Sequence, residues 1–162
     1  MFPRRSQWGE VQTWVNSQWK IPTFPGQIST EINTGSVILL LSSTLQRFQE
    51  DSAAGAEEWN LAAPLFGGHS VGQVIVAAAN GVRHDDEWAK TRVAKPIQRR
   101  SQDILSKALP SASVRRRLAP GLAIEVLDTL SSGGSFEKLN ENMFTFAHGV
   151  ALKVRARGSR PI

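Results

Sequence analysis

The sequence predicts an all-α protein, a bundle of helices around one core. Apolar residues recur at spacings of three and four over most of the chain, which is the period of a helix with one buried face. Pro and Gly are gathered in short segments between these stretches. Sustained alternation of apolar and polar residues is missing, although Leu122 to Leu127 alone also fits a buried strand. With 162 residues, 41% of them hydrophobic, the chain suits one domain with its own core.

The first two predicted helices lie before residue 55. Ser6 is placed to cap the first, which ends before Pro22. Its apolar stripe consists of Trp8, Val11, Val15 and Trp19. The second helix is longer, is expected to begin at a cap on Thr30 or Thr34, and weakens after Glu50. Its buried stripe consists of Ile38, Leu41, Leu45 and Phe48.

A short helical turn and another long helix are expected next. The turn lies between Glu57 and Leu65 and has Trp59 as its buried anchor. The pair Gly67-Gly68 then breaks the helical pattern. Ser70 is a good N-cap for the helix that follows, which runs from Val71 to Trp88.

Three further helices and a short basic one are predicted in the second half. The first spans Ala94 to Leu109 with Pro96 in its first turn, where the missing amide costs little. A short basic helix from Ser113 to Leu118 and a helix from Leu122 to Leu130 follow, and Ser135 is placed to cap the last helix. The stripe of the last helix, expected to pack on the long second helix, consists of Phe136, Leu139, Met143, Phe146 and Val150.

The helix from Val71 changes from apolar to polar on one side. At roughly 100° per residue, its main apolar residues fall on one face. These are Val74, Ile75, Ala78 and Val82. The polar residues on the opposite face are Gln73, Asn80, His84 and Glu87. An amide, an imidazole and a carboxylate at this spacing suit a site that holds a polar substrate and moves a proton, while the alternative is an ordinary solvated face.

The segment from Asn80 to Trp88 resembles the core of the HEPN superfamily, small helical proteins that include RNase toxins and abortive-infection effectors. The signature of that superfamily is an Arg, a polar residue that is often Asn, three further residues and a His. Asn80 and His84 match it, and Ala79 occupies the position of the Arg. The resemblance divides the chain into an N-terminal helical extension (1–29), a HEPN-like helical domain (30–154) and a basic C-terminal tail (155–162).

The resemblance implies a metal-independent endoribonuclease, a hydrolase of a toxin–antitoxin or phage-defence system. His84 would be its general acid or base, and Asn80 would orient His84 or a phosphate. Because Ala79 replaces the signature Arg, the resemblance implies an inactive or weakened form, through natural loss or engineered inactivation. With position 79 on the polar face, Ala79→Arg is expected to restore cleavage. The alternative is a non-catalytic helical scaffold that binds RNA or protein.

Three more polar residues are candidates for substrate binding: Arg83, Gln73 and Glu87. Arg83 lies one turn beyond Ala79 and approaches the same region from a different backbone position. Arg83 and Glu87 also have a purely structural interpretation, because an ion pair at this spacing stabilises a helix by roughly 0.2–0.5 kcal/mol.

Composition excludes several kinds of chemistry. The chain has no cysteine, which excludes disulfides, thiolate catalysis and cysteine-bound zinc. Its three histidines, His69, His84 and His148, lack metal-ligand spacing, so neither a metal nor another cofactor is expected, and His148 is interpreted as structural. No apolar run approaches the ~20 residues of a membrane span, and no apolar segment follows Arg4-Arg5 to make a secretory signal. A cytoplasmic protein without membrane contact is expected.

Positive charge indicates a polyanionic partner. The net charge of +5 comes from basic residues after the polar helix and at the C-terminus. They are Arg92, Lys95, Arg99, Arg100, Lys107, Arg115, Arg116, Arg117, Lys153, Arg155, Arg157 and Arg160. Clustered cations favour RNA, although basic runs are also common on solvated helices. The other expected partners are a second copy, in a homodimer with Asn80 and His84 near the two-fold axis, and an antitoxin or defence-system protein.

Overall fold

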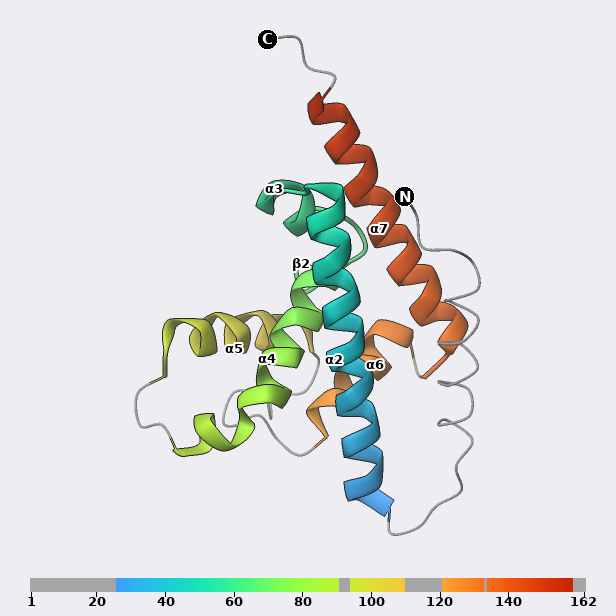
Figure 1. The fold of residues 1–162 in the computed structure, drawn as a ribbon. Coiled ribbons are helices and arrows are strands. Elements are labelled where there is room, and N and C mark those ends of the chain that lie inside the picture. Colours follow the sequence, from blue (N-terminus) through green and yellow to red (C-terminus); the bar gives the residue numbers. More distant parts are fainter. Residues whose placement is uncertain (1–25, 91–93, 110–120, 133, 159–162) are drawn as a thin grey trace.

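The computed structural model describes residues 26–90, 94–109, 121–132 and 134–158. Within these ranges the protein is a helical bundle with one very short β-hairpin, so the all-α prediction is confirmed (Figure 1). The helix expected after Ser6 and the one from Ser113 to Leu118 lie outside the described residues. The elements are α2 (Gly26–Ser52), α3 (Ala56–Asn60), β1 (Leu65–Phe66), β2 (His69–Ser70), α4 (Val71–Lys90), α5 (Pro96–Ala108), α6 (Leu122–Ser131) and α7 (Phe136–Gly158).

Helix α4 is the centre of the bundle. Helices α2, α5 and α6 pack along it, and α3, α7 and the hairpin contact it as well. In Figure 1 it crosses behind α2 and runs down toward the side of the molecule where α5 lies. Its fully buried side chains are Val71, Val74, Ile75, Ala78 and Ala79. Because neighbours surround it, α4 is buried over a wider arc than the apolar face predicted for it.

Helix α2 is longer than the sequence indicated. It begins at Gly26, so the expected caps at Thr30 and Thr34 lie inside the helix. Its predicted stripe is confirmed, since Ile38 and Leu45 are buried and the other two members pack on the core. The domain boundary expected at 29/30 falls inside this helix, and the one at 154/155 falls inside α7.

Two aromatic rings, one from α3 and one from α7, pack against the start of α4. Trp59 of α3 and Phe146 of α7 are both buried, with ring centroids 4.9 Å apart in an edge-to-face arrangement of 86°. Both rings press on Gly72, where an added Cβ would lie 2.5 Å from Trp59 and 2.7 Å from Phe146. The three elements therefore meet closely because residue 72 has no side chain. Trp59 is the buried anchor that the sequence predicted, within a shorter helical turn.

The hairpin between α3 and α4 was not predicted. Leu65 pairs with Ser70 and Phe66 with His69, across a turn in which Gly67 and Gly68 have φ of 55° and 84°. Positive φ at both turn residues is the requirement of a tight two-residue hairpin, which Gly-Gly meets without strain. From the sequence, this pair was expected only to break the helical pattern, and the hairpin corrects that expectation.

Helix α7 confirms four of the five residues of the predicted stripe and corrects its packing partner. Leu139, Met143, Phe146 and Val150 are buried, whereas Phe136 is half-buried. The four buried residues face mainly α6, α3 and α4, whereas α2 was the expected partner. The segment from Leu122 forms helix α6, which settles the alternative of a buried strand in favour of helix.

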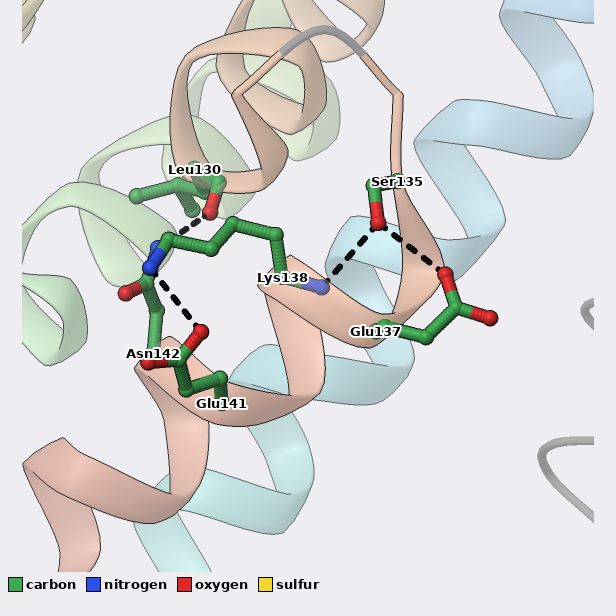
Figure 2. A network of polar contacts seen from close by, with 6 residues as sticks. All are labelled: Leu130, Ser135, Glu137, Lys138, Glu141 and Asn142. Atoms are coloured by element: carbon green, nitrogen blue, oxygen red, sulfur yellow. Dashed lines mark hydrogen bonds and ion pairs between the residues drawn. The ribbon is translucent and has the colours of Figure 1, made fainter.

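Figure 2 shows how the beginning of α7 is held. The Ser135 hydroxyl accepts a hydrogen bond from the Lys138 amide at 3.2 Å, which confirms Ser135 as the N-cap. Asn142 donates its side-chain amide to the Leu130 carbonyl at 2.7 Å and so ties α7 to α6. The pKa of the Glu137 carboxyl is lowered, first by its own backbone amide and then by the Ser135 hydroxyl, because both donate to the charged form.

Arg157 connects the C-terminal end of α7 to its neighbours. Its guanidinium pairs with the nearly buried Glu58 at 2.9 Å and donates to the Ala53 carbonyl, also at 2.9 Å. Arg157 was expected to attract RNA, but here it joins α7 to α3 and to the end of α2. None of the described helices has the length and apolar character needed to cross a lipid bilayer.

Candidate functional site

The interface of α4 and α5 is polar at one end. The buried face of α5 begins with Gln98 and Ser101 and continues with Ile104, Leu105 and Ala108. Asn80 of α4 meets the polar part, where its side-chain nitrogen donates to the Ser101 hydroxyl at 3.3 Å. The side-chain carbonyl oxygen of Gln98 (Oε1) is buried and has no hydrogen-bond donor among the described residues. A buried acceptor without a donor usually lowers the free energy of unfolding by about 1–3 kcal/mol. The polar end of this interface is therefore expected to reduce the stability of the bundle.

The other predicted site residues of α4 follow Asn80 on the same side of the helix. His84 lies one turn further, is half-buried, and has a polar or ring contact of its own. Arg83 is exposed beside it, and the side chain of Glu87 lies outside the described residues. The structure therefore brings together an anchored amide, an imidazole and a guanidinium. This group of Asn80, Arg83 and His84 is referred to below as the α4 polar group.

Gln73 does not belong to this group. It lies two turns before Asn80 and completes a capping box with Ser70. The Ser70 amide donates to the Gln73 side-chain oxygen at 3.1 Å, and the Gln73 amide donates to the Ser70 hydroxyl at 3.3 Å. The described contacts of Gln73 therefore assign it to the start of α4, whereas its role in substrate binding stays a prediction. The pattern Ser-x-x-Gln before an apolar run was visible in the sequence and indicates the capping role.

Gln73→Ala is therefore expected to lower the free energy of unfolding by about 1 kcal/mol through loss of one half of the capping box. Chemical denaturation measures this difference. Gln73→Glu is the matched control, because a glutamate at this position retains the acceptor and a favourable charge at the helix N-terminus. Equal stability of all three proteins would contradict the capping role.

Ala79 is not on the polar side of α4. Its exposed fraction is 0%, and its neighbours Ala77 and Ala78 are buried with it. Consecutive helical residues point roughly 100° apart, so Ala79 does not share the side of the helix on which Asn80 lies. The expectation that residue 79 shares the polar face is therefore corrected. A longer side chain at residue 79 would start inside the core. The described cation of α4 nearest to His84 in sequence is Arg83.

Several of the basic residues expected to bind RNA have partners within the chain, Lys95 and Arg155 among them. Arg157 pairs with Glu58, and Lys107 pairs with Asp103 one turn earlier at 2.7 Å. Arg83, Arg99 and Arg100 are exposed. The basic residues outside the described part are Arg92, Arg115, Arg116, Arg117 and Arg160.

The remaining histidines lie away from the α4 polar group. His69 is half-buried in β2, and His148 is exposed on α7, where it stacks on Phe144 with ring centroids 6.2 Å apart and planes inclined by 3°. His148 was interpreted as structural, and its described ring contact is with Phe144 on the surface of α7. Within the described ranges, no three acidic or histidine side chains gather closely enough to hold a metal ion.

Within the α4 polar group, Arg83 is exposed, and Asn80 and His84 are half-buried. Two shallow hollows occur elsewhere, one on α6 around Gly121 and Asp128 and one at the end of α2 around Gln49 and Ala53. An exposed guanidinium such as that of Arg83 suits contact with a phosphate group.

The fold and this group define an all-α bundle with one central helix, whose accessible side carries an amide, an imidazole and a guanidinium. Comparison of the chain with protein-family models, with curated proteins and with solved structures gave no significant match.

Proposed function

We propose that this chain is a HEPN-like RNA-binding protein of a toxin–antitoxin or phage-defence system, in which endoribonuclease activity is lost or weakened. The observation that carries the proposal is the α4 polar group. Asn80 is held by Ser101, His84 follows one turn later, and Arg83 is exposed beside it. These three side chains offer the contacts that an RNA phosphate requires.

The arrangement suits binding of the RNA backbone. An exposed guanidinium can donate two hydrogen bonds to phosphate oxygens, and a neighbouring imidazole can add a third. Arg99 and Arg100 of α5 are exposed as well, and the chain carries a net charge of +5. Contacts of this kind release counterions from RNA and make the affinity depend on salt.

The same side chains would support metal-independent cleavage at a low rate. In that reaction the ribose 2′-hydroxyl loses its proton and attacks the adjacent phosphorus, and the 5′-oxygen leaves and is protonated. His84 would carry a proton in this exchange, and a cation would stabilise the charge on the phosphate oxygens. The resemblance gives the role of the cation to position 79, where this chain has Ala, and Arg83 is its proposed substitute.

A non-catalytic RNA-binding scaffold is the second candidate. The burial of Ala79 favours it, because the bundle packs around a small side chain at the position where a HEPN nuclease carries its Arg. Both candidates bind RNA, and residual RNA cleavage distinguishes a weakened nuclease from the scaffold.

RNA binding is tested with Arg83→Gln. We expect about 5-fold lower affinity for single-stranded RNA near 0.1 M salt and a salt dependence reduced by about 0.7 in log–log slope, the effect of losing one phosphate contact. Arg47→Gln is the matched control, because Arg47 is exposed on α2, pairs with Asp51 at 3.2 Å, and gives the same change in net charge. Fluorescence anisotropy at several salt concentrations measures both. Equal losses in the two variants would assign binding to net charge alone and remove α4 as the site.

Cleavage is tested with the same RNA in the presence of EDTA. Products ending in a 2′,3′-cyclic phosphate that disappear in His84→Ala would support the weakened nuclease. Absence of cleavage together with Arg83-dependent binding would support the scaffold. Cleavage that persists in His84→Ala would point to a contaminating nuclease and count against the catalytic proposal.

A further inference from the structure

Helix α7 presents an apolar surface on the side opposite the core. Phe144 is 72% exposed and Leu152 is 53% exposed, and His148 lies between them. These residues follow each other at intervals of four, so they form one stripe along the helix. In Figure 1, α7 lies at the edge of the described bundle, and its last turns extend past α2 and α3.

The stripe continues with a charged residue at each end. Glu141 precedes Phe144 by one turn, and Arg155 follows Leu152 by one turn; both are exposed. The outer face of α7 is defined here by Glu141, Phe144, His148, Leu152 and Arg155. The rings of Phe144 and His148 are nearly parallel, with centroids 6.2 Å apart and planes inclined by 3°, so two neighbouring rings occupy the middle of this face.

The outer face is complementary to a reversed copy of itself. Phe144 and Leu152 lie four residues to either side of His148, and Glu141 and Arg155 lie seven residues to either side. When two such helices pack antiparallel with His148 at the crossing, Phe144 meets Leu152 of the partner subunit and Glu141 meets Arg155 of the partner subunit. A surface that pairs with itself in this way is the requirement for a two-fold dimer.

The charge along the helix selects the antiparallel direction. The first turns of α7 carry Glu137 and Glu141, and the last turns carry Lys153 and Arg155. A parallel pair would set like charges side by side, whereas an antiparallel pair sets acid against base at both ends. Antiparallel helix dipoles favour the same direction. Glu141 also pairs with Lys138 of its own helix at 2.9 Å, through one carboxylate oxygen.

We propose that two copies of this chain associate through the outer face of α7, antiparallel around a two-fold axis at His148. From the sequence, the dimer axis was expected at Asn80 and His84 instead. Those two residues are half-buried, whereas all five residues of the outer face of α7 are exposed. The proposal does not depend on RNA binding.

A charge exchange tests the register. Glu141→Arg and Arg155→Glu are each expected to raise the dimer dissociation constant about 5-fold or more, because each sets like charges against one another at two places per dimer. The double variant restores opposite charges and is expected to return the dissociation constant to within about 2-fold of the original. Sedimentation velocity over a wide concentration range measures all four proteins. Failure of the double variant to recover association would overturn the register.

The apolar centre is tested with Leu152→Glu, which is expected to weaken association about 10-fold or more by burying an unpaired carboxylate in the interface. Leu40→Glu is the matched control, because Leu40 is a similarly exposed leucine (44%) within another long helix, α2. Circular dichroism verifies that both variants fold. A wild-type chain that stays monomeric at every concentration, or a dimer that Leu152→Glu weakens no more than Leu40→Glu, would overturn the proposal.

Discussion

Phe146→Ala is expected to lower the free energy of unfolding by about 3–5 kcal/mol, the range for deleting a fully buried aromatic ring. The ring is completely buried and meets Trp59 edge-to-face at 4.9 Å. It also lies against Gly72, so its removal leaves a cavity where α3, α4 and α7 meet. Because an ordinary domain has about 5–15 kcal/mol of stability, this single change would remove much of it.

Phe144→Ala is the control for this experiment. It removes the same ring from the same helix, but Phe144 is 72% exposed. Its expected effect on a monomer is within about 0.5 kcal/mol. Denaturant titration at a concentration below dimer formation compares the two variants. Similar losses in both would mean that α7 does not pack on the core in solution through the face described here.

Ala79→Arg is expected to lower the free energy of unfolding by at least about 3–5 kcal/mol, the usual effect of an unpaired charge in a protein core. The Ala79 side chain is completely buried, and the added guanidinium would also exceed the space of a methyl group. The structure therefore replaces the expectation from the sequence, in which this substitution restored cleavage without disturbing the fold.

Val76→Arg is the matched control, because Val76 lies on the same helix and is half-buried. A long side chain at the edge of the core can extend its charge to water, so the expected cost is about 1 kcal/mol. Thermal unfolding and soluble yield compare the two proteins. If Ala79→Arg melts like the wild type and cleaves RNA in EDTA, residue 79 is accessible in solution and its placement in the core is wrong.

The helical periods and the caps were the most predictable features. Ser70 and Ser135 were identified as N-caps from the residues beside them, and both accept the expected backbone hydrogen bond. The apolar stripe of α7 was predicted from spacing alone, and it is buried from Leu139 to Val150. These features depend on residues within one or two turns, so the local sequence contains the information they require.

The candidate site was only partly predictable. Asn80 and His84 share one side of α4 because they are one turn apart, which the sequence states directly. Ser101, the residue that anchors Asn80, comes from another helix and was missed, and no local signal points to it. The capping role of Gln73 was missed although the pattern Ser-x-x-Gln was visible in the sequence.

By itself, the sequence determined most of the helical segments, the N-caps of α4 and α7, and which side chains lie one turn apart on these two helices. Only the tertiary structure decided how much of each helix is covered. Enclosure of α4 by α2, α5 and α6 buries Ala79, and close approach of Trp59 and Phe146 requires a glycine at residue 72. The tertiary structure also decided that α7 packs on α6, α3 and α4 and leaves the Phe144 side chain exposed. Helical periodicity is a short-range property, whereas the neighbours of a helix are chosen by close packing among segments far apart in the chain.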